Sequence, residues 1–444
     1  MKKILILGAG MSASTLIKYL LEKSTANNWF LTVADIDIKL AEKKIANHPN
    51  AKAASFNIKE DKDVDNLIQQ NDIVVSMLPA IFHPIVGKKC LQFSKSLFTA
   101  SYVSPEMRSY DKEAKEKNLL FFNECGVDPG IDHMSAMKTI DEIKEAGGKI
   151  TGFESYCGGL IAPEFDNNPW NYKFTWNARN VILAGQAGAQ FMENGKYKYI
   201  PYSRLFERIT KTSMDGFGDF EIYANRDSLK YREIYGLQDV ETILRGSMRR
   251  PGYCAAWNCF VQLGVTDDTY ELNELNNLTN RSFIAAFLPE NKNKSIEDNF
   301  CEYLKIDRNG NIFKRMEWLG LFEETPIKKG AKTPAQILQS IIEPKWQLGE
   351  KDLDLLVMQH IFHYELNNKK FKRTSSMGII GTDPVHTAMA ITVGMPMALC
   401  IESYLTGKIS GKGVQTPVKK EYYTPILEGL KPFGVVFKEE EHEV

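Results

Sequence analysis

The stretch Ile4-Leu-Ile-Leu-Gly8-Ala9-Gly10-Met11-Ser12-Ala13 decides the fold of the N-terminal part of the chain. Its four apolar residues predict a strand that is buried on both faces, as in a parallel sheet. The glycine pattern that follows lies at a strand-to-helix turn, where Gly8 permits the tight turn and Gly10 lets the backbone approach a pyrophosphate. A small residue, Ala13, lets the helix pack closely on the strand. The helix N-terminus would present free N–H groups to phosphates, so we predict a dinucleotide-binding Rossmann unit.

The alternation of strand-like and helix-like segments continues through residue 125. Further strands are expected at 30–34, 53–56, 73–76, 97–100 and 119–122, and helices at 11–23, 37–46, 61–70, 82–91 and 105–117. Repeated βαβ units of this kind predict an α/β fold with a Rossmann-type, doubly wound parallel sheet.

The pattern changes after Gly126, and 444 residues are too many for one hydrophobic core. We expect a Rossmann domain at 1–127, completed by about 391–444, of which 438–444 would form a frayed charged tail. A mixed α/β substrate and dimerisation domain is expected at 128–267 and 368–390, with a helical insertion at 268–367. A substrate would bind in a cleft near the carboxyl ends of the sheet strands.

Composition excludes several classes of function. The net charge of −1 gives no support to nucleic-acid or membrane-surface binding, and no apolar run approaches the roughly 20 residues needed to span a bilayer. The opening Met1-Lys2-Lys3 is followed by too short an apolar run for a signal peptide. Seven scattered cysteines form neither a disulfide framework nor a zinc spacing. We therefore expect a cytoplasmic protein with reduced cysteines and no metal site.

Two acidic residues follow the second expected strand. Asp35 ends this strand, where a carboxylate can accept hydrogen bonds from the adenosine ribose and would repel a 2′-phosphate. NAD(H) is therefore favoured over NADP(H). Asp37 is a rival for this role, although we interpret it as the cap of the second helix. The stretch Ser76-Met77-Leu78 ends the fourth strand, where the nicotinamide half of a dinucleotide normally lies in this fold.

Several longer blocks carry a resemblance to a known family. They are Thr99-Ala-Ser-Tyr-Val-Ser-Pro105, Asn123-Glu-Cys-Gly-Val-Asp-Pro-Gly-Ile-Asp-His133, Ser155-Tyr-Cys-Gly-Gly-Leu-Ile-Ala-Pro-Glu164, Tyr172-Lys-Phe-Thr-Trp176, Asn225-Arg-Asp-Ser228 and Thr392-Val-Gly-Met-Pro396. In these blocks the chain resembles the saccharopine reductases (saccharopine dehydrogenase, L-glutamate-forming), and the likeness spans nearly the whole chain.

The resemblance implies a reaction in lysine metabolism. Members condense L-glutamate with 2-aminoadipate 6-semialdehyde and reduce the imine with NAD(P)H to give saccharopine, or run the reverse reaction. It implies that the junction of cofactor and substrate is lined by Ser101, Tyr102 and Asp128, and that substrate carboxylates meet Arg226, Ser247 and Arg249. The cofactor-binding residues would be Gly8, Gly10, Met11, Ser12, Ala13, Asp35, Asn57, Ser76, Met77, Leu78, Gly126, Val127, Asp128, Pro129, Gly130, Thr175 and Trp176. A homodimer is expected from this likeness alone.

The arginine content after Asn225 supports an anionic substrate independently of the resemblance. Saccharopine carries three carboxylates, and an arginine fork binds a carboxylate with two hydrogen bonds while it keeps its charge. The five arginines are Arg226, Arg232, Arg245, Arg249 and Arg250. We assign Arg226, Arg245 and Arg249 to the substrate, and Arg232 and Arg250 to a solvated basic face.

Forming and hydrolysing a carbinolamine requires proton transfer. The candidate groups are Asp128, Tyr102 and Cys157, and the sequence does not rank them. Asp128 has a second interpretation as the N-cap of a helix at 131–146, and Cys157 as a small packed residue. We interpret His133 as a support for the loop rather than as the base.

One departure from the family concerns the cofactor. Typical relatives carry an arginine for the 2′-phosphate after the second strand, whereas this chain has Asp35-Ile36-Asp37. Two other functions are alternatives to this reaction. A carboxynorspermidine synthase-like imine reductase would bind a largely cationic polyamine, which the arginines at 226–250 argue against. A non-catalytic nicotinamide-binding sensor would have no need of Ser101, Tyr102, Asp128 and Arg226.

Overall fold

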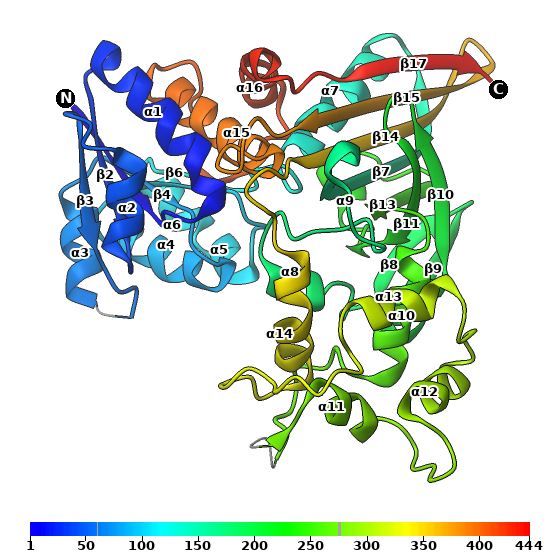
Figure 1. Cartoon of the computed structure of the whole chain (residues 1–444). Helices are drawn as coiled ribbons and strands as arrows, with labels where there is room; N and C mark the ends of the chain where they lie inside the picture. The colour runs from blue at the N-terminus through cyan, green and yellow to red at the C-terminus, as the bar shows by residue number, and fades with distance from the viewer. Residues whose placement is uncertain (60, 274–276) are drawn as a thin grey trace. The chain divides into compact units, whose positions relative to one another are not determined.

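The computed structural model describes residues 1–59, 61–273 and 277–444, which form two compact units (Figure 1). Unit 1 comprises Met1–Lys149 and Ile379–Lys438, and unit 2 comprises Ile150–Gly378 and Glu439–Val444. The chain therefore leaves unit 1 and returns to it late in the sequence, as expected for a Rossmann domain that is completed by a C-terminal segment.

Unit 1 is built on a parallel sheet with the strand order β16-β6-β5-β4-β1-β2-β3. The strands are β1 (Lys2–Leu7), β2 (Trp29–Asp35), β3 (Ala51–Ser55), β4 (Ile73–Ser76), β5 (Ser96–Thr99), β6 (Leu120–Phe122) and β16 (Gly413–Gln415). All the neighbouring pairs are parallel. The predicted doubly wound sheet is confirmed, and its seventh strand comes from the C-terminal segment.

Helices cover both faces of this sheet (Figure 1). One face packs its strand residues Leu5, Leu7 and Leu97 against α3 (Asp61–Gln69), α4 (His83–Gln92), α5 (Pro105–Ser109) and α6 (Asp111–Glu116). On the other face the ring of Phe98 contacts Tyr404 of α15 (Ala388–Leu405), and that of Phe122 contacts Tyr422 of α16 (Lys420–Leu430). This second layer also holds α1 (Ser14–Asn27) and α2 (Ile38–Ile45).

Helix α15 packs closely on the start of α1. A Cβ atom added at Gly394 would lie 2.9 Å from the backbone nitrogen of Leu16 and 3.1 Å from the carbonyl oxygen of Ser12, so only glycine permits this approach. Among the described helices, α15 alone is long and apolar enough to cross a membrane by composition, and most of it is buried inside the protein. Such burial is what a core helix of unit 1 requires.

The boundary between the units differs from the expected one. Helix α7 (Ile131–Glu145) belongs to unit 1, so the first segment of that unit ends at Lys149 rather than at residue 127. Helix α7 stays with unit 1 because it is bound to α16, where Tyr423 donates to Asp141 at 2.6 Å and Lys420 pairs with Glu145 at 2.6 Å.

Unit 2 contains a mixed sheet with the main order β10-β11-β13-β7-β14-β15-β17, and β8, β9 and β12 extend it. The strands are β7 (Lys149–Ile161), β8 (Ala189–Glu193), β9 (Lys196–Ile200), β10 (Ile209–Met214), β11 (Gly218–Ala224), β12 (Arg226–Asp227), β13 (Thr242–Arg249), β14 (Asp354–Leu366), β15 (Lys369–Ile380) and β17 (Lys438–Glu443).

The helices of unit 2 pack against an aromatic core. They are α8 (Ala178–Ile182), α9 (Tyr231–Ile234), α10 (Tyr253–Leu263), α11 (Asn280–Ala286), α12 (Ile296–Leu304), α13 (Asn311–Trp318) and α14 (Pro334–Trp346). The expected helical insertion at 268–367 is therefore helical only as far as α14, and residues 274–276 lie outside the described chain. Its last part is β14, whose first seven residues are buried in the sheet.

The end of the chain also departs from expectation. Residues 438–444 were predicted to fray, yet all but the last of them form β17 (Lys438–Glu443) beside β15. Tyr364 and Arg373 both bind the Glu441 carboxylate, at 2.5 and 2.6 Å, and Ser375 donates to Glu439 at 2.6 Å. The charged side chains that suggested a loose tail are the groups that attach this strand to unit 2.

Candidate functional site

The glycine turn of unit 1 has the geometry that a dinucleotide needs. Gly8 has a φ of 101° and its N–H donates to the Ala34 carbonyl at 2.8 Å. A Cβ there would lie 3.0 Å from the carbonyl oxygen of Met77, so the turn lies against the end of β4. Gly10 caps a short 3-10 turn (Met11–Ala13) that leads into α1, and nothing lies within 4 Å of a Cβ added to it. This open space beside the backbone fits a pyrophosphate, with Ala13 buried beneath it.

Asp35 is joined directly to this turn. Its carboxylate accepts from the backbone N–H of Ala9 at 2.7 Å and from that of Asp37 at 3.0 Å. Asp37 accepts from the N–H of Lys39 at 3.1 Å and caps α2, which confirms the interpretation of Asp37 as a cap. Asn57 lies after β3, where its side chain accepts from the N–H of Lys59 at 3.1 Å.

Tyr102 and Asp128 meet in unit 1. The Tyr102 hydroxyl donates to Asp128 Oδ1 at 2.7 Å, and both residues are half-buried. Asp128 belongs to a tight turn in which the Gly126 N–H donates to the Pro129 carbonyl at 3.0 Å. A Cβ on Gly126 would lie 3.0 Å from that of Ala100, which places this turn against the segment that carries Ser101. The structure therefore brings Ser101, Tyr102 and the turn at 126–130 together.

A buried cluster of charged groups supports this turn. His133 is fully buried, and its Nε2 lies 2.7 Å from Glu124 Oε2 and its Nδ1 3.7 Å from Asp132 Oδ2. Glu124 also accepts from the N–H of Val103 at 2.9 Å, and Asp132 from that of Gly130 at 2.6 Å. His133 thus supports the two segments that carry Tyr102 and Asp128, as predicted. The alternative for Asp128, a cap of α7, is not seen, because Gly130 occupies the N-cap position.

A further group of buried polar side chains lies at the carboxyl ends of β4 and β5. His83, the first residue of α4, has Nδ1 2.9 Å from Ser76 Oγ, and its Nε2 lies 2.8 Å from Ser101 Oγ and 3.0 Å from Thr99 Oγ1. Burial lowers the pKa of His83 to about 4, so its ring is neutral near pH 7. This residue connects a predicted cofactor residue, Ser76, to a predicted substrate residue, Ser101.

In unit 2, predicted residues from neighbouring strands share one face of the sheet. Arg245, Ser247 and Arg249 alternate along β13 and therefore point to the same side. Ser247 is paired with Cys157 of β7 and with Tyr223 of β11. Cys157 and Ser247 are partly exposed, whereas Arg245 and Arg249 are buried. We call this row the arginine face.

Arg249 is enclosed by aromatic rings. Its guanidinium carbon lies 5.1, 5.6 and 5.3 Å from the ring centroids of Tyr172, Tyr223 and Tyr253, and only 5% of the residue is exposed. Nη1 donates to the Met248 carbonyl at 2.8 Å, but Nε has no hydrogen-bond partner among the described residues. Burial raises the pKa of both Tyr172 and Tyr253, so these phenols are neutral and supply no anion.

The other arginines have different environments. The Arg245 guanidinium stacks 4.3 Å from the ring centroid of Tyr231. Arg250 donates to the Phe217 carbonyl at 2.6 Å, and Arg232 donates to the carbonyl of Gln238, so both are tied to the backbone of unit 2. Thr175 is buried and Trp176 half-buried in the segment that packs on Trp346.

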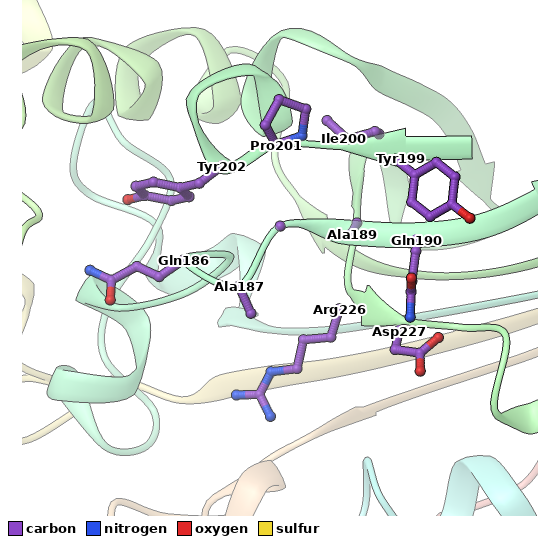
Figure 2. Close-up of a pocket in the computed structure, with 11 residues that line it drawn as sticks. Gln186, Ala187, Ala189, Gln190, Tyr199, Ile200, Pro201, Tyr202, Arg226 and Asp227 are labelled. Atoms are coloured by element: carbon purple, nitrogen blue, oxygen red, sulfur yellow. The ribbon is translucent and has the colours of Figure 1, made fainter. Parts of the chain in front are cut away.

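Arg226 is exposed, has a left-handed backbone with a φ of 53°, and borders a pocket of about 560 Å³ in unit 2. Figure 2 shows its guanidinium directed away from Tyr199 and Pro201. Tyr202 and Gln186 form one wall and are fixed by Thr266, at 2.8 Å and 2.5 Å. The lining residues are Gln186, Ala187, Gly188, Ala189, Gln190, Tyr199, Ile200, Pro201, Tyr202, Arg226 and Asp227.

Comparison with known proteins identifies the family of the chain. Residues 4–121 match the family model described as the saccharopine dehydrogenase NADP binding domain, and residues 126–435 match the saccharopine dehydrogenase C-terminal domain. The chain belongs to the saccharopine dehydrogenase family. The predicted resemblance is thereby confirmed.

Individual relatives match over the full length of this saccharopine dehydrogenase family member. The L-glutamate-forming, NADP(+) saccharopine dehydrogenase of Schizosaccharomyces pombe is 33% identical over 99% of both chains. The mitochondrial alpha-aminoadipic semialdehyde synthase of Rattus norvegicus is 34% identical, and there the chain matches about half (47%) of the longer protein. The solved apo structure of saccharopine dehydrogenase (L-Glu forming) from Saccharomyces cerevisiae has a TM-score of 0.89 and 30% identity, with both chains fully covered.

Sequence reasoning missed two buried polar residues that contact the segment 101–103, which carries predicted site residues. His83 was not considered because a single histidine at a helix start carries no spacing signal. Glu124 lies inside a quoted block, but its contact with His133 required the fold. Among the described residues there is no group of three His, Cys, Asp or Glu side chains that could hold a metal ion.

Proposed function

We propose that this protein is a nicotinamide-dependent saccharopine dehydrogenase that forms L-glutamate. It would interconvert saccharopine with L-glutamate and 2-aminoadipate 6-semialdehyde, a reaction of lysine metabolism. The observation that carries the proposal is Arg249, a buried cation that forms no ion pair with any described carboxylate. A buried charge is normally compensated, so this environment suits a substrate that brings its own carboxylates. The names of the full-length relatives point to the same substrate.

The residues of each unit have separable tasks in this reaction. The cofactor, when bound, would supply hydride-transfer chemistry at C6 of the aminoadipate part of saccharopine, the carbon that becomes the aldehyde. Gly8, Gly10 and Ala13 leave room for the pyrophosphate of the cofactor. The Tyr102 hydroxyl and the Asp128 carboxylate share a hydrogen bond of 2.7 Å and are suited to move the protons of imine formation and hydrolysis. Cys157 remains a third candidate for this proton transfer.

The experiment is an assay of the purified protein with saccharopine and either NAD+ or NADP+, followed at the absorbance of the reduced nicotinamide. We expect reduction of the nucleotide with release of one glutamate per hydride transferred. Carboxynorspermidine serves as the matched control substrate and should give no signal. Binding of the nucleotide without any oxidation of saccharopine would contradict the proposal, and activity only with carboxynorspermidine would select the polyamine enzyme instead.

We propose that NAD(H) is the preferred cofactor of this chain. The Asp35 carboxylate ends β2 and is held by the N–H groups of Ala9 and Asp37. A fixed negative charge at this position repels a 2′-phosphate and accepts from a ribose hydroxyl. The family model and several relatives carry NADP in their names, so this chain would differ from them at this point.

The cofactor proposal is tested by the ratio of kcat/KM for NAD+ and NADP+. We expect the wild type to favour NAD+ and Asp35→Ser to lose most of that preference. Asp37→Ser is the matched control, because it removes a neighbouring carboxylate whose contact is the cap of α2. A wild-type preference for NADP+, or an unchanged ratio in Asp35→Ser, would refute the role of Asp35.

We further propose that the protein is a cytoplasmic homodimer. All seven cysteines lie in the described chain and none forms a disulfide there, and six of them are buried, which suits a reducing compartment. The long strands of unit 2 offer a sheet that two copies can share. Analytical ultracentrifugation should give a mass of twice the 50.4 kDa chain, and a monomer at micromolar concentration would contradict the dimer.

A further inference from the structure

His83 binds three hydroxyl groups at the carboxyl ends of two adjacent strands. Ser76 is the last residue of β4, Thr99 the last residue of β5, and Ser101 follows two residues later. The ring nitrogens of His83 reach all three, with Nδ1 on Ser76 and Nε2 on Ser101 and Thr99 at 2.8–3.0 Å. His83 itself is only 4% exposed. A buried polar side chain that is bonded at both ends has a single fixed orientation.

The neutral ring has one N–H, and its position determines which of the surrounding hydroxyls donates a hydrogen bond and which accepts one. If Nε2 carries the proton, it donates to Ser101, the nearer of its two partners at 2.8 Å against 3.0 Å for Thr99, and Nδ1 accepts from Ser76. If Nδ1 carries the proton, both directions are reversed. The first arrangement leaves the Ser101 proton available to a carboxylate, and the second leaves only its lone pairs. No described carboxylate forms an ion pair with His83, and its low pKa keeps it neutral.

We propose that His83 is a positioning residue that fixes both the place and the donor direction of the Ser101 hydroxyl. It does so in the Nε2–H form, in which the Ser101 hydroxyl donates to a substrate carboxylate. The inference rests on the proposed function, because it takes Ser101 to contact saccharopine. Ser76 provides the second anchor, so the end of β4 and the substrate-binding hydroxyl are held by one ring.

The kinetic test compares two substitutions of His83 in the wild type and one of them again in a Ser101→Ala background. His83→Leu keeps the bulk of the ring and removes both hydrogen bonds, so the KM for saccharopine should rise about tenfold, the effect of one lost hydrogen bond, while the KM for the nucleotide changes less than twofold. His83→Gln can donate and accept, and should restore the saccharopine KM to within about threefold of wild type. In a Ser101→Ala background, His83→Leu should change the saccharopine KM less than twofold.

The matched control is Ser96→Ala. Ser96 is buried in the same sheet, and its hydroxyl bonds to the Leu120 N–H and lies 3.1 Å from the Tyr404 hydroxyl, away from Ser101. This variant should leave both KM values within twofold of wild type. Equal effects of His83→Leu in the presence and absence of the Ser101 hydroxyl would overturn the proposal, as would failure of His83→Gln to restore KM.

A second measurement does not depend on the reaction. In protein labelled with ¹⁵N-histidine, the nitrogen shifts of His83 should report a neutral ring with the proton on Nε2, and they should change in Ser101→Ala. A ring protonated at Nδ1 would overturn the proposal, as would nitrogen shifts that are the same in Ser101→Ala as in the wild type. Either result would count even if the protein folds and oxidises saccharopine normally. The proposed function fails if the wild type does not oxidise saccharopine, and the substrate contact of Ser101 fails if Ser101→Ala leaves the KM for saccharopine unchanged. In either case the nitrogen shifts still decide whether His83 fixes the orientation of the Ser101 hydroxyl.

Discussion

The polar groups around Ser101, Tyr102 and Asp128 in unit 1 and the arginine face of unit 2 are buried in opposite ways. Around Ser101, Tyr102 and Asp128 the partners are supplied by the chain itself, through His83 and the Glu124–His133 pair. On the arginine face, Arg249 is surrounded by aromatic rings, and one of its nitrogens finds no acceptor among the described residues.

This difference separates groups that are complete from groups that need a ligand. A network in which each member has a partner is rigid, and it holds catalytic groups in place. A buried guanidinium without an anion costs desolvation free energy that a bound carboxylate can recover. We therefore expect substitutions of the Tyr102–Asp128 pair to change the rate of reaction, and those on the arginine face to change substrate affinity.

The largest expected effect is that of Arg249→Met. Methionine fills a similar volume among the three tyrosines but cannot bind a carboxylate, so the KM for saccharopine should rise about 30- to 100-fold, corresponding to about 2–3 kcal/mol. The nucleotide KM should be unchanged. Because an uncompensated charge leaves the core, the Tm should stay the same or increase. Steady-state kinetics and thermal denaturation measure the two effects.

The control for Arg249→Met is Arg250→Met, one residue along the chain. Arg250 donates to the Phe217 carbonyl rather than facing the tyrosines, so its removal should change the saccharopine KM less than about twofold. A lower Tm of Arg249→Met with an unchanged KM would show that Arg249 is a cation–π support for the aromatic core. In that case Arg249 would not need a bound carboxylate, and the two regions would no longer differ in this respect.

A smaller effect is expected for Tyr102→Phe in the complete network of unit 1. The ring remains, but Asp128 loses the hydrogen bond of 2.7 Å, and kcat should fall roughly tenfold, or about 1–1.5 kcal/mol, while the saccharopine KM changes little. Rapid-mixing kinetics can assign the loss to imine hydrolysis. Tyr110→Phe is the control, because its hydroxyl binds Glu106 at an exposed position of the same unit. A change in KM with kcat intact would mean that Tyr102 binds substrate rather than moving protons.

The sequence predicted unit 1 better than unit 2, for a physical reason. A strand buried on both faces, a glycine turn and an Asp cap are local features, and they placed Gly8, Gly10 and Asp37 correctly. The apolar run of β14 was assigned to a helical segment because a fully buried strand and a buried helix have similar composition. The contact of His83 with Ser101 joins residues from different elements, and no local pattern encodes it.

The smallest expected effect concerns β17, the charged strand that the sequence did not predict. Tyr364 and Arg373 bind Glu441 and hold the pKa of its carboxyl below the usual glutamate range, against the opposing effect of burial. Because the folded-state pKa is lowered, this stabilisation is present at neutral pH and is lost as the pH falls through the glutamate range. Glu441 is 38% exposed, so Glu441→Gln should lower the free energy of unfolding by only about 0.5 kcal/mol at pH 7, and by less at pH 3. Urea denaturation at both pH values measures the difference, with Glu440→Gln on the same strand as the comparison variant. An equal loss at pH 3 and pH 7 would mean that packing, rather than charge, attaches β17 to unit 2.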